Sequence, residues 1–176
     1  MRLVPVLAGV LLASSLSRAA PAAGADPATA NLAAPVLIGS AGVFALLDDE
    51  FADRLLLGLQ YRGAPRTSWS LRPGVGVLGG EDGMSYLYAD LARDFALPRR
   101  WIATLSFGFG WFNNGDRIEV VDAREFQTVL AVSRQLGRGT RIGLSASHVS
   151  NGGWSSPNQG TETLALFVAL PFSRWR

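Results

Sequence analysis

Apolar and polar side chains alternate with a period of two through most of the chain. Between positions 101 and 111, the odd positions carry Trp, Ala, Leu and Phe, whereas the even positions carry Ile, Thr, Ser and Gly. Successive side chains of a strand point to opposite faces, so this pattern predicts strands with one large apolar face and one small or polar face. We expect eight of them, at residues 36–47, 53–62, 67–78, 84–95, 100–112, 124–135, 139–150 and 161–172.

An even number of alternating strands of about ten residues is typical of small outer-membrane barrels. Aromatic residues at strand ends, namely Tyr61, Trp69, Trp101 and Trp111, fit the girdles at the membrane interfaces. The pattern therefore predicts an all-β fold, an eight-stranded antiparallel transmembrane β-barrel of the bacterial outer membrane. Its apolar faces would contact lipid, and its small faces would fill a lumen with room only for side chains. The alternative is a soluble exported lipocalin-like barrel or β-sandwich, which requires a charged outer face that these strands lack.

The N-terminal segment resembles an export signal. Residues 1–25 combine Arg2, an apolar run and a small-residue cleavage site before Asp26. We therefore expect a cleaved signal peptide at 1–25 and a single barrel domain at 26–176. With the mature N-terminus in the periplasm, segments 113–123 and 151–160 become external loops and the chain lies in the outer membrane.

Composition excludes several classes of function. The 16 basic residues are all arginines, they are scattered, and the net charge is only +2, which argues against nucleic-acid binding. The chain has no cysteine and one histidine, so neither a thiolate site nor a multi-histidine metal cluster can form. We expect no cofactor and no metal, and any imidazole chemistry must use His148.

Three polar residues fall on the apolar face of the last two strands. His148 and Ser150 share the parity of Leu144, and Glu162 shares that of Leu166. A hairpin centred near residue 155 places His148 opposite Glu162, within side-chain reach, with Ser150 two residues along the same face. A nucleophile, a base and a carboxylate in one row are what hydrolysis by an activated serine requires. The alternative is that they are incidental, because a charge near the interface costs only about 0–1 kcal/mol.

The surrounding motif carries a family resemblance. Residues 148–153 read His-Val-Ser-Asn-Gly-Gly, and residues 157–162 read Pro-Asn-Gln-Gly-Thr-Glu. This pattern resembles the signature of the lipid A 3-O-deacylase (PagL) family, whose members are eight-stranded outer-membrane barrels. The similarity covers about fifteen residues with their spacing intact, and elsewhere the agreement is in length and strand count.

The resemblance implies a serine esterase that removes the ester-linked 3-hydroxyacyl chain from lipid A. Ser150 would be the nucleophile, His148 the general base and Glu162 its orienting partner. Asn158 and the backbone at Gly152 and Gly153 would form the oxyanion hole, and Asn151 would support the loop. The partners implied are lipopolysaccharide and membrane lipid, and the sequence leaves a homodimer open. Two other readings remain, a non-enzymatic structural barrel and an acyltransferase barrel that adds a chain to lipid A.

Overall fold

The computed structural model describes residues 31–44, 54–113, 123–154 and 160–172. The expected signal peptide lies outside these residues and stays a prediction. No helix in the described part of the chain is long and apolar enough to cross a membrane. Eight strands are present, as the alternation predicts: β1 Val36–Phe44, β2 Arg54–Arg62, β3 Arg72–Gly80, β4 Ser85–Leu97, β5 Trp101–Asn113, β6 Arg124–Gln135, β7 Arg141–Ser150 and β8 Thr161–Pro171.

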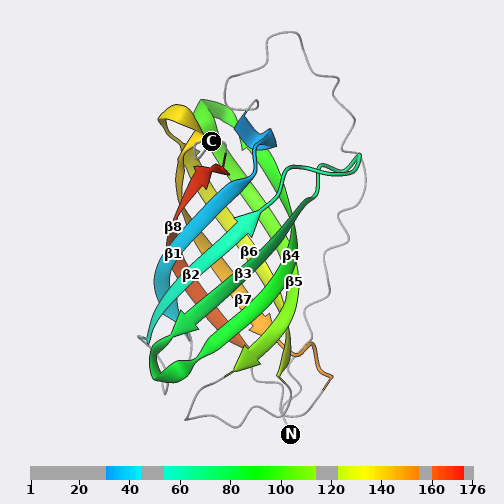
Figure 1. The fold of residues 1–176 in the computed structure, drawn as a ribbon, viewed down its shortest axis with the longest axis vertical. Helices are drawn as coiled ribbons and strands as arrows, with labels where there is room; N and C mark the ends of the chain where they lie inside the picture. Colours follow the sequence, from blue (N-terminus) through cyan, green and yellow to red (C-terminus); the bar gives the residue numbers. More distant parts are fainter. Residues whose placement is uncertain (1–30, 45–53, 114–122, 155–159, 173–176) are drawn as a thin grey trace, which may run out of the picture.

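The strands form one closed antiparallel barrel (Figure 1). Each strand pairs with its neighbour in the chain, and β1 pairs with β8 from Val36 opposite Pro171 to Phe44 opposite Thr163. Closure leaves no strand edge unpaired, which is required of a sheet surrounded by hydrocarbon. The expected fold class is therefore confirmed.

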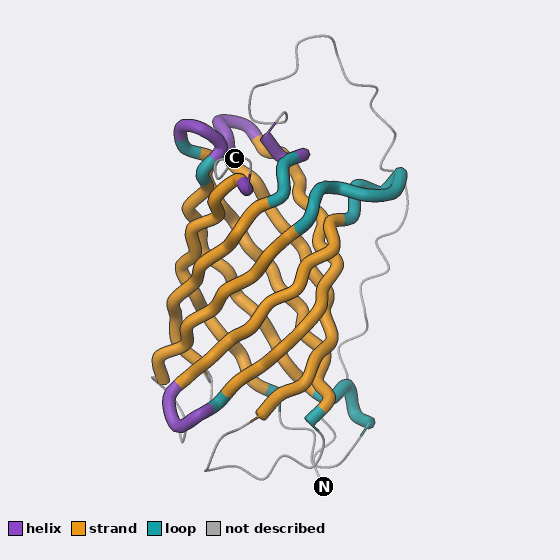
Figure 2. The backbone as a smooth tube through the Cα atoms, viewed as in Figure 1, coloured by secondary structure: helices purple, strands orange, loops and turns teal. Residues whose placement is uncertain are grey.

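The two ends of the barrel differ in their connections (Figure 2). One end, called here the turn end, carries the short 3₁₀ turns η3 (Pro98–Arg100) and η5 (Gly137–Gly139). The other, called the loop end, is where β5 and β7 finish and where β6 and β8 begin. It also carries η2 (Glu81–Gly83) between β3 and β4. In the expected topology, the turn end faces the periplasm and the loop end faces outward.

One strand boundary was predicted wrongly by more than two residues, while the predicted end of the first strand, at residue 47, lies outside the described residues. The third strand begins at Arg72 and not at residue 67, because a turn precedes it. Arg66 and Leu71 form an isolated bridge that closes this turn, and Thr67 and Ser70 adopt positive φ values of 72° and 56°. Trp69 consequently lies in an exposed turn and not in a strand. The apparent parity of residues 67–71 came from a tight turn whose side chains happened to alternate.

The outer wall of the barrel is apolar. Leu57 and Leu87 are each 56% exposed, and Leu130 and Leu166 are 63% and 64% exposed. Large apolar side chains exposed on all sides indicate a barrel whose solvent is lipid. The soluble alternative, with apolar faces inside, is therefore wrong.

The lumen is filled by polar side chains that bind one another. Arg62 pairs with Asp90 at 3.0 Å, and Ser106 donates a hydrogen bond to the same carboxylate. Nearer the turn end, Asp94 pairs with both Arg72 and Arg141. Each of these five charged side chains thus has a partner of opposite sign, without which burial would be very costly.

Small residues make room for this filling. The Tyr88 ring lies over Gly76, where an added Cβ would come within 2.6 Å of the ring. A Cβ at Gly110 would lie 2.1 Å from the carbonyl oxygen of Leu87. The glycines on the lumen faces of β3 and β5 therefore permit the close packing of Tyr88 inside a narrow barrel.

Candidate active site

The wall formed by β7 and β8 carries the three polar residues singled out from the sequence. On β7, Ile142, Leu144 and Ala146 are exposed, whereas Arg141 and Val149 are buried. Because side chains alternate along a strand, His148 and Ser150 project outward with the exposed set. On β8, Glu162 shares its parity with Leu166, which also faces outward.

His148 and Glu162 lie directly opposite each other in the register of β7 and β8, as predicted. The His148 Nδ1 and Glu162 Oε1 atoms are 3.0 Å apart, and the two side chains are 51% and 35% exposed. An ionised carboxylate can only accept a hydrogen bond, so the pairing places the proton on Nδ1. The Nε2 lone pair is then left available as a base.

Ser150 lies two residues beyond His148 on the same face. It pairs with Phe126 of β6 and is half-buried. Among the described residues, no hydrogen bond joins the Ser150 hydroxyl to the imidazole. The two Cα atoms are separated by about 7 Å, a distance that side-chain rotation can bridge. Catalytic hydrogen bonds of this kind are often long without substrate and shorten in the complex.

Asn151 supports the turn that follows Ser150. Its side chain is buried, and Oδ1 accepts a hydrogen bond from the Gly153 amide at 2.8 Å. Gly152 and Gly153 both adopt positive φ, 67° and 83°, which favours glycine at each position. Because the Gly153 N–H is engaged by Asn151, the Gly152 N–H is the donor of this pair that remains for a ligand. Asn158 lies outside the described residues.

Gly160 is a site residue for which no role was predicted. A Cβ at this position would lie 2.5 Å from His148 Cε1 and 3.1 Å from Nε2. The imidazole therefore packs against the backbone just before β8, and glycine is what permits that approach. The motif included Gly160, but its contact with the imidazole depends on how the side chains pack in the fold.

The site is distinct from the interior of the barrel. The cavity in the lumen is lined by inward residues such as Gln60, Arg62 and Ser133, and not by any of the three polar residues of the outer wall. Among the described residues, no three His, Asp or Glu side chains are grouped so that they could hold a metal ion. The chemistry that this wall supports is acid–base and nucleophilic, at a surface facing lipid.

Comparison with solved structures supports the fold. The crystal structure of the outer membrane enzyme PagL matches with a TM-score of 0.58 and 21% identity, covering 78% of this chain and 99% of that chain. Neisserial surface protein A (NspA) matches with a TM-score of 0.53 and 10% identity, over 78% and 96% of the two chains. A de novo designed transmembrane β-barrel matches with a TM-score of 0.52 and 12% identity, over 78% and 93%. These structural similarities show that the chain has the fold of a small transmembrane β-barrel.

The family is shown by sequence. No curated protein matches the chain. The family model described as lipid A 3-O-deacylase (PagL) matches residues 55–171, which covers β2 to β8 and all the polar residues of the candidate site. The match spans well over half of the sequence and places the motif in its expected hairpin. The chain therefore belongs to the lipid A 3-O-deacylase (PagL) family, and it is an outer-membrane β-barrel esterase.

Proposed function

We propose that this chain hydrolyses the ester-linked 3-hydroxyacyl chain of lipid A through a Ser150–His148–Glu162 triad on the outer wall of the barrel. The observation that carries the proposal is the hydrogen bond between His148 Nδ1 and Glu162 Oε1, on the face that Ser150 shares. A carboxylate bound at Nδ1 orients the ring and stabilises the imidazolium that forms when Nε2 takes a proton.

The reaction follows from these groups. The Ser150 hydroxyl attacks the acyl carbonyl while His148 Nε2 accepts its proton, and a tetrahedral oxyanion forms. Collapse of this intermediate expels the sugar 3-hydroxyl, which takes the proton back from His148. Water activated by His148 then cleaves the acyl-enzyme and releases a 3-hydroxy fatty acid.

The oxyanion requires donors near Ser150. We assign this role to the Gly152 N–H and to the side-chain amide of Asn158, while Asn151 and Gly153 hold the turn. One such donor is commonly worth about 3 kcal/mol of transition-state stabilisation.

The position of the triad suits a substrate that stays in the membrane. Leu144 and Ala146 on β7 and Leu166 on β8 form an exposed apolar stripe on the mid-barrel side of His148. An acyl chain lying on this stripe would remain in hydrocarbon while its ester reaches Ser150. A single chain supplies all the groups named, and the homodimer stays a prediction.

Mass spectrometry of lipid A from cells that express the chain tests the proposal. The wild-type protein should yield lipid A lighter by one 3-hydroxyacyl chain, and Ser150→Ala should yield unmodified lipid A. Ser147→Ala is the matched control, because Ser147 is on the same strand but its hydroxyl bonds Thr163 on the lumen side. Unchanged lipid A from the wild-type protein would indicate a structural barrel, and added mass would indicate acyl transfer. Activity retained by Ser150→Ala would exclude the triad.

A further inference from the structure

An aromatic cluster covers the outer wall of the barrel beside Ser150. It consists of Phe107 and Phe109 on β5, Phe126 on β6 and Trp154 after β7. The Phe126 ring lies 4.9 Å from the Trp154 ring, 5.1 Å from Phe109 and 5.8 Å from Phe107. Since Phe126 pairs with Ser150 in the strand register, this aromatic cluster borders the active site on the side away from Glu162.

The aromatic cluster is confined to one side of the barrel. On β2, β3 and β4, the large exposed side chains of the described residues toward the loop end are aliphatic, namely Leu55, Leu57, Val77 and Leu87. A girdle that only anchors a barrel at the membrane interface surrounds it on all sides. The restriction of the rings to the wall beside Ser150 therefore indicates a function specific to this part of the barrel surface.

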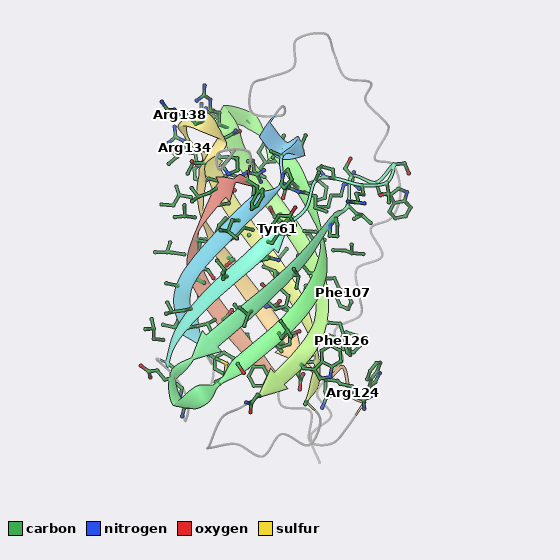
Figure 3. All side chains as sticks on the ribbon, viewed as in Figure 1. Tyr61, Phe107, Arg124, Phe126, Arg134 and Arg138 are labelled. Atoms are coloured by element: carbon green, nitrogen blue, oxygen red, sulfur yellow. The ribbon has the colours of Figure 1, made fainter. Side chains whose placement is uncertain are left out.

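Arg124 extends this surface toward the loop end. Its side chain is exposed, and its Cζ atom lies 5.9 Å from the centroid of the Trp154 ring. Arg124 precedes Phe126 by two residues on the same face of β6, so it lies about 7 Å nearer the loop end. Figure 3 shows Phe107, Phe126 and Arg124 following one another toward that end, with Arg134 of the same strand near the opposite end.

The order of these groups matches the order of groups in the substrate. Lipid A is a phosphorylated glycolipid whose phosphates lie on the water side of its ester-linked chains. A guanidinium binds phosphate through paired N–H donors, and an aromatic face beneath it limits its motion. Toward the loop end, the wall presents first the apolar stripe, then Ser150 and then Arg124. The corresponding groups of the substrate are the acyl chain, the ester and the phosphate.

We infer that Arg124 is a positioning residue that binds the lipid A phosphate nearest the ester attacked by Ser150. The inference rests on the proposed function, and it adds a headgroup subsite to the triad. Trp154 holds the guanidinium over the aromatic cluster. The phosphate contact fixes the distance of the sugar from Ser150 and selects substrates that carry this phosphate.

The test compares doubly and singly phosphorylated lipid A and two arginine variants in detergent micelles. With lipid A phosphorylated on both sugars, Arg124→Gln should raise the apparent KM about tenfold with little change in kcat. With lipid A from which one or the other phosphate has been removed, loss of the phosphate that Arg124 binds should give the wild-type protein the same raised KM, and Arg124→Gln should then add nothing. Arg124→Lys, which keeps the charge but not the paired donors, should lie between. Arg134→Gln is the matched control, since Arg134 is exposed on the same strand at the turn end, and it should leave KM unchanged.

Two kinetic results would overturn the inference: an unchanged KM in Arg124→Gln, or an equal rise in KM with the doubly phosphorylated lipid and with both singly phosphorylated lipids. Binding to the inactive Ser150→Ala protein separates this inference from the proposed function. If the wild-type protein releases no acyl chain, the proposed function fails. Equal affinity of Ser150→Ala and Ser150→Ala/Arg124→Gln for the bisphosphorylated lipid would overturn the Arg124 subsite.

Discussion

The barrel holds ionisable side chains in two settings, inside the lumen and on the outer wall. Inside, the Asp94 side chain is 4% exposed and binds Arg72 at 2.6 Å, Arg141 at 2.9 Å and Thr104 at 2.7 Å. On the outer wall, the 51% exposed His148 ring has Glu162 as its one side-chain partner among the described residues.

The ionisable groups of the lumen and of the outer wall differ in how many side-chain partners they have. A charge inside the lumen must be neutralised by its neighbours, and the Asp94 carboxylate, which already binds three side chains, is committed to the fold. The outer pair uses one ring nitrogen and leaves the other without a side-chain partner among the described residues, on the wall that also carries Ser150. We expect substitutions in the lumen to change stability and substitutions on the wall to change catalysis.

The largest expected effect is that of His148→Ala. Removing the base should lower kcat by at least about 10⁴-fold, because no other imidazole exists in the chain to accept the serine proton. The barrel should still fold, since the ring is half-exposed and packs only against the outer wall. Release of 3-hydroxy fatty acid from lipid A, with heat-modifiable gel mobility as the folding control, checks both parts. A loss of the folded band would place His148 among the structural residues.

Asp94→Asn should have the opposite effect, a loss of stability with little change in activity. It leaves two buried guanidinium groups with a neutral partner, and breaking a buried ion pair costs about 3–5 kcal/mol. Urea unfolding in lipid vesicles, followed by tryptophan fluorescence, measures this loss. The activity per folded molecule should remain near the wild-type value, because Asp94 contacts the turn-end lumen and not β8. A fall in kcat of the folded protein would contradict the proposal that lumen residues serve stability and wall residues serve catalysis.

The ease of prediction also differs between these two settings. Parity alone placed His148, Ser150 and Glu162 on one face, because a strand exposes every second residue and a hairpin fixes its own register. The lumen contacts could not be predicted in the same way. Arg72 and Asp94 lie on the neighbouring strands β3 and β4, but Arg141 lies on β7, so the three side chains meet only once the barrel closes.

The turn before β3 and the close contact of Gly160 could not be predicted from the alternation either. The positive φ values of Thr67 and Ser70 accompany a bridge between Arg66 and Leu71. Threonine and serine do not by themselves indicate positive φ. The contact of Gly160 with the imidazole depends on side-chain placement and not on pattern. The alternation therefore predicted the face and the pairing of the site residues, while the packing around the site depends on contacts that form only in the folded barrel.

Glu162→Ala should be milder than the loss of the base. The third member of a triad orients the ring and does not itself take the proton, so we expect kcat to fall about 10²-fold. This substitution sharpens the comparison, since removing an acid from the wall should leave the free energy of unfolding unchanged within about 0.5 kcal/mol. Parallel measurements of kcat and urea midpoint against Asp94→Asn check it. A destabilisation as large as that of Asp94→Asn would show that Glu162 serves the fold.

The smallest expected effect is that of Gly160→Ala, which changes no polar group. The new Cβ would come within 2.5 Å of His148 Cε1, so the ring must move away from its present position opposite Glu162. Small misplacements of a catalytic group are costly, and we expect about a tenfold fall in kcat with KM unchanged. If Gly160 acts through the orientation of the ring, its substitution should cost much less in the Glu162→Ala background, where that orientation is already lost. Equal losses of kcat in both backgrounds would mean that Gly160 and Glu162 act independently, and the wall would then position His148 by two separate contacts.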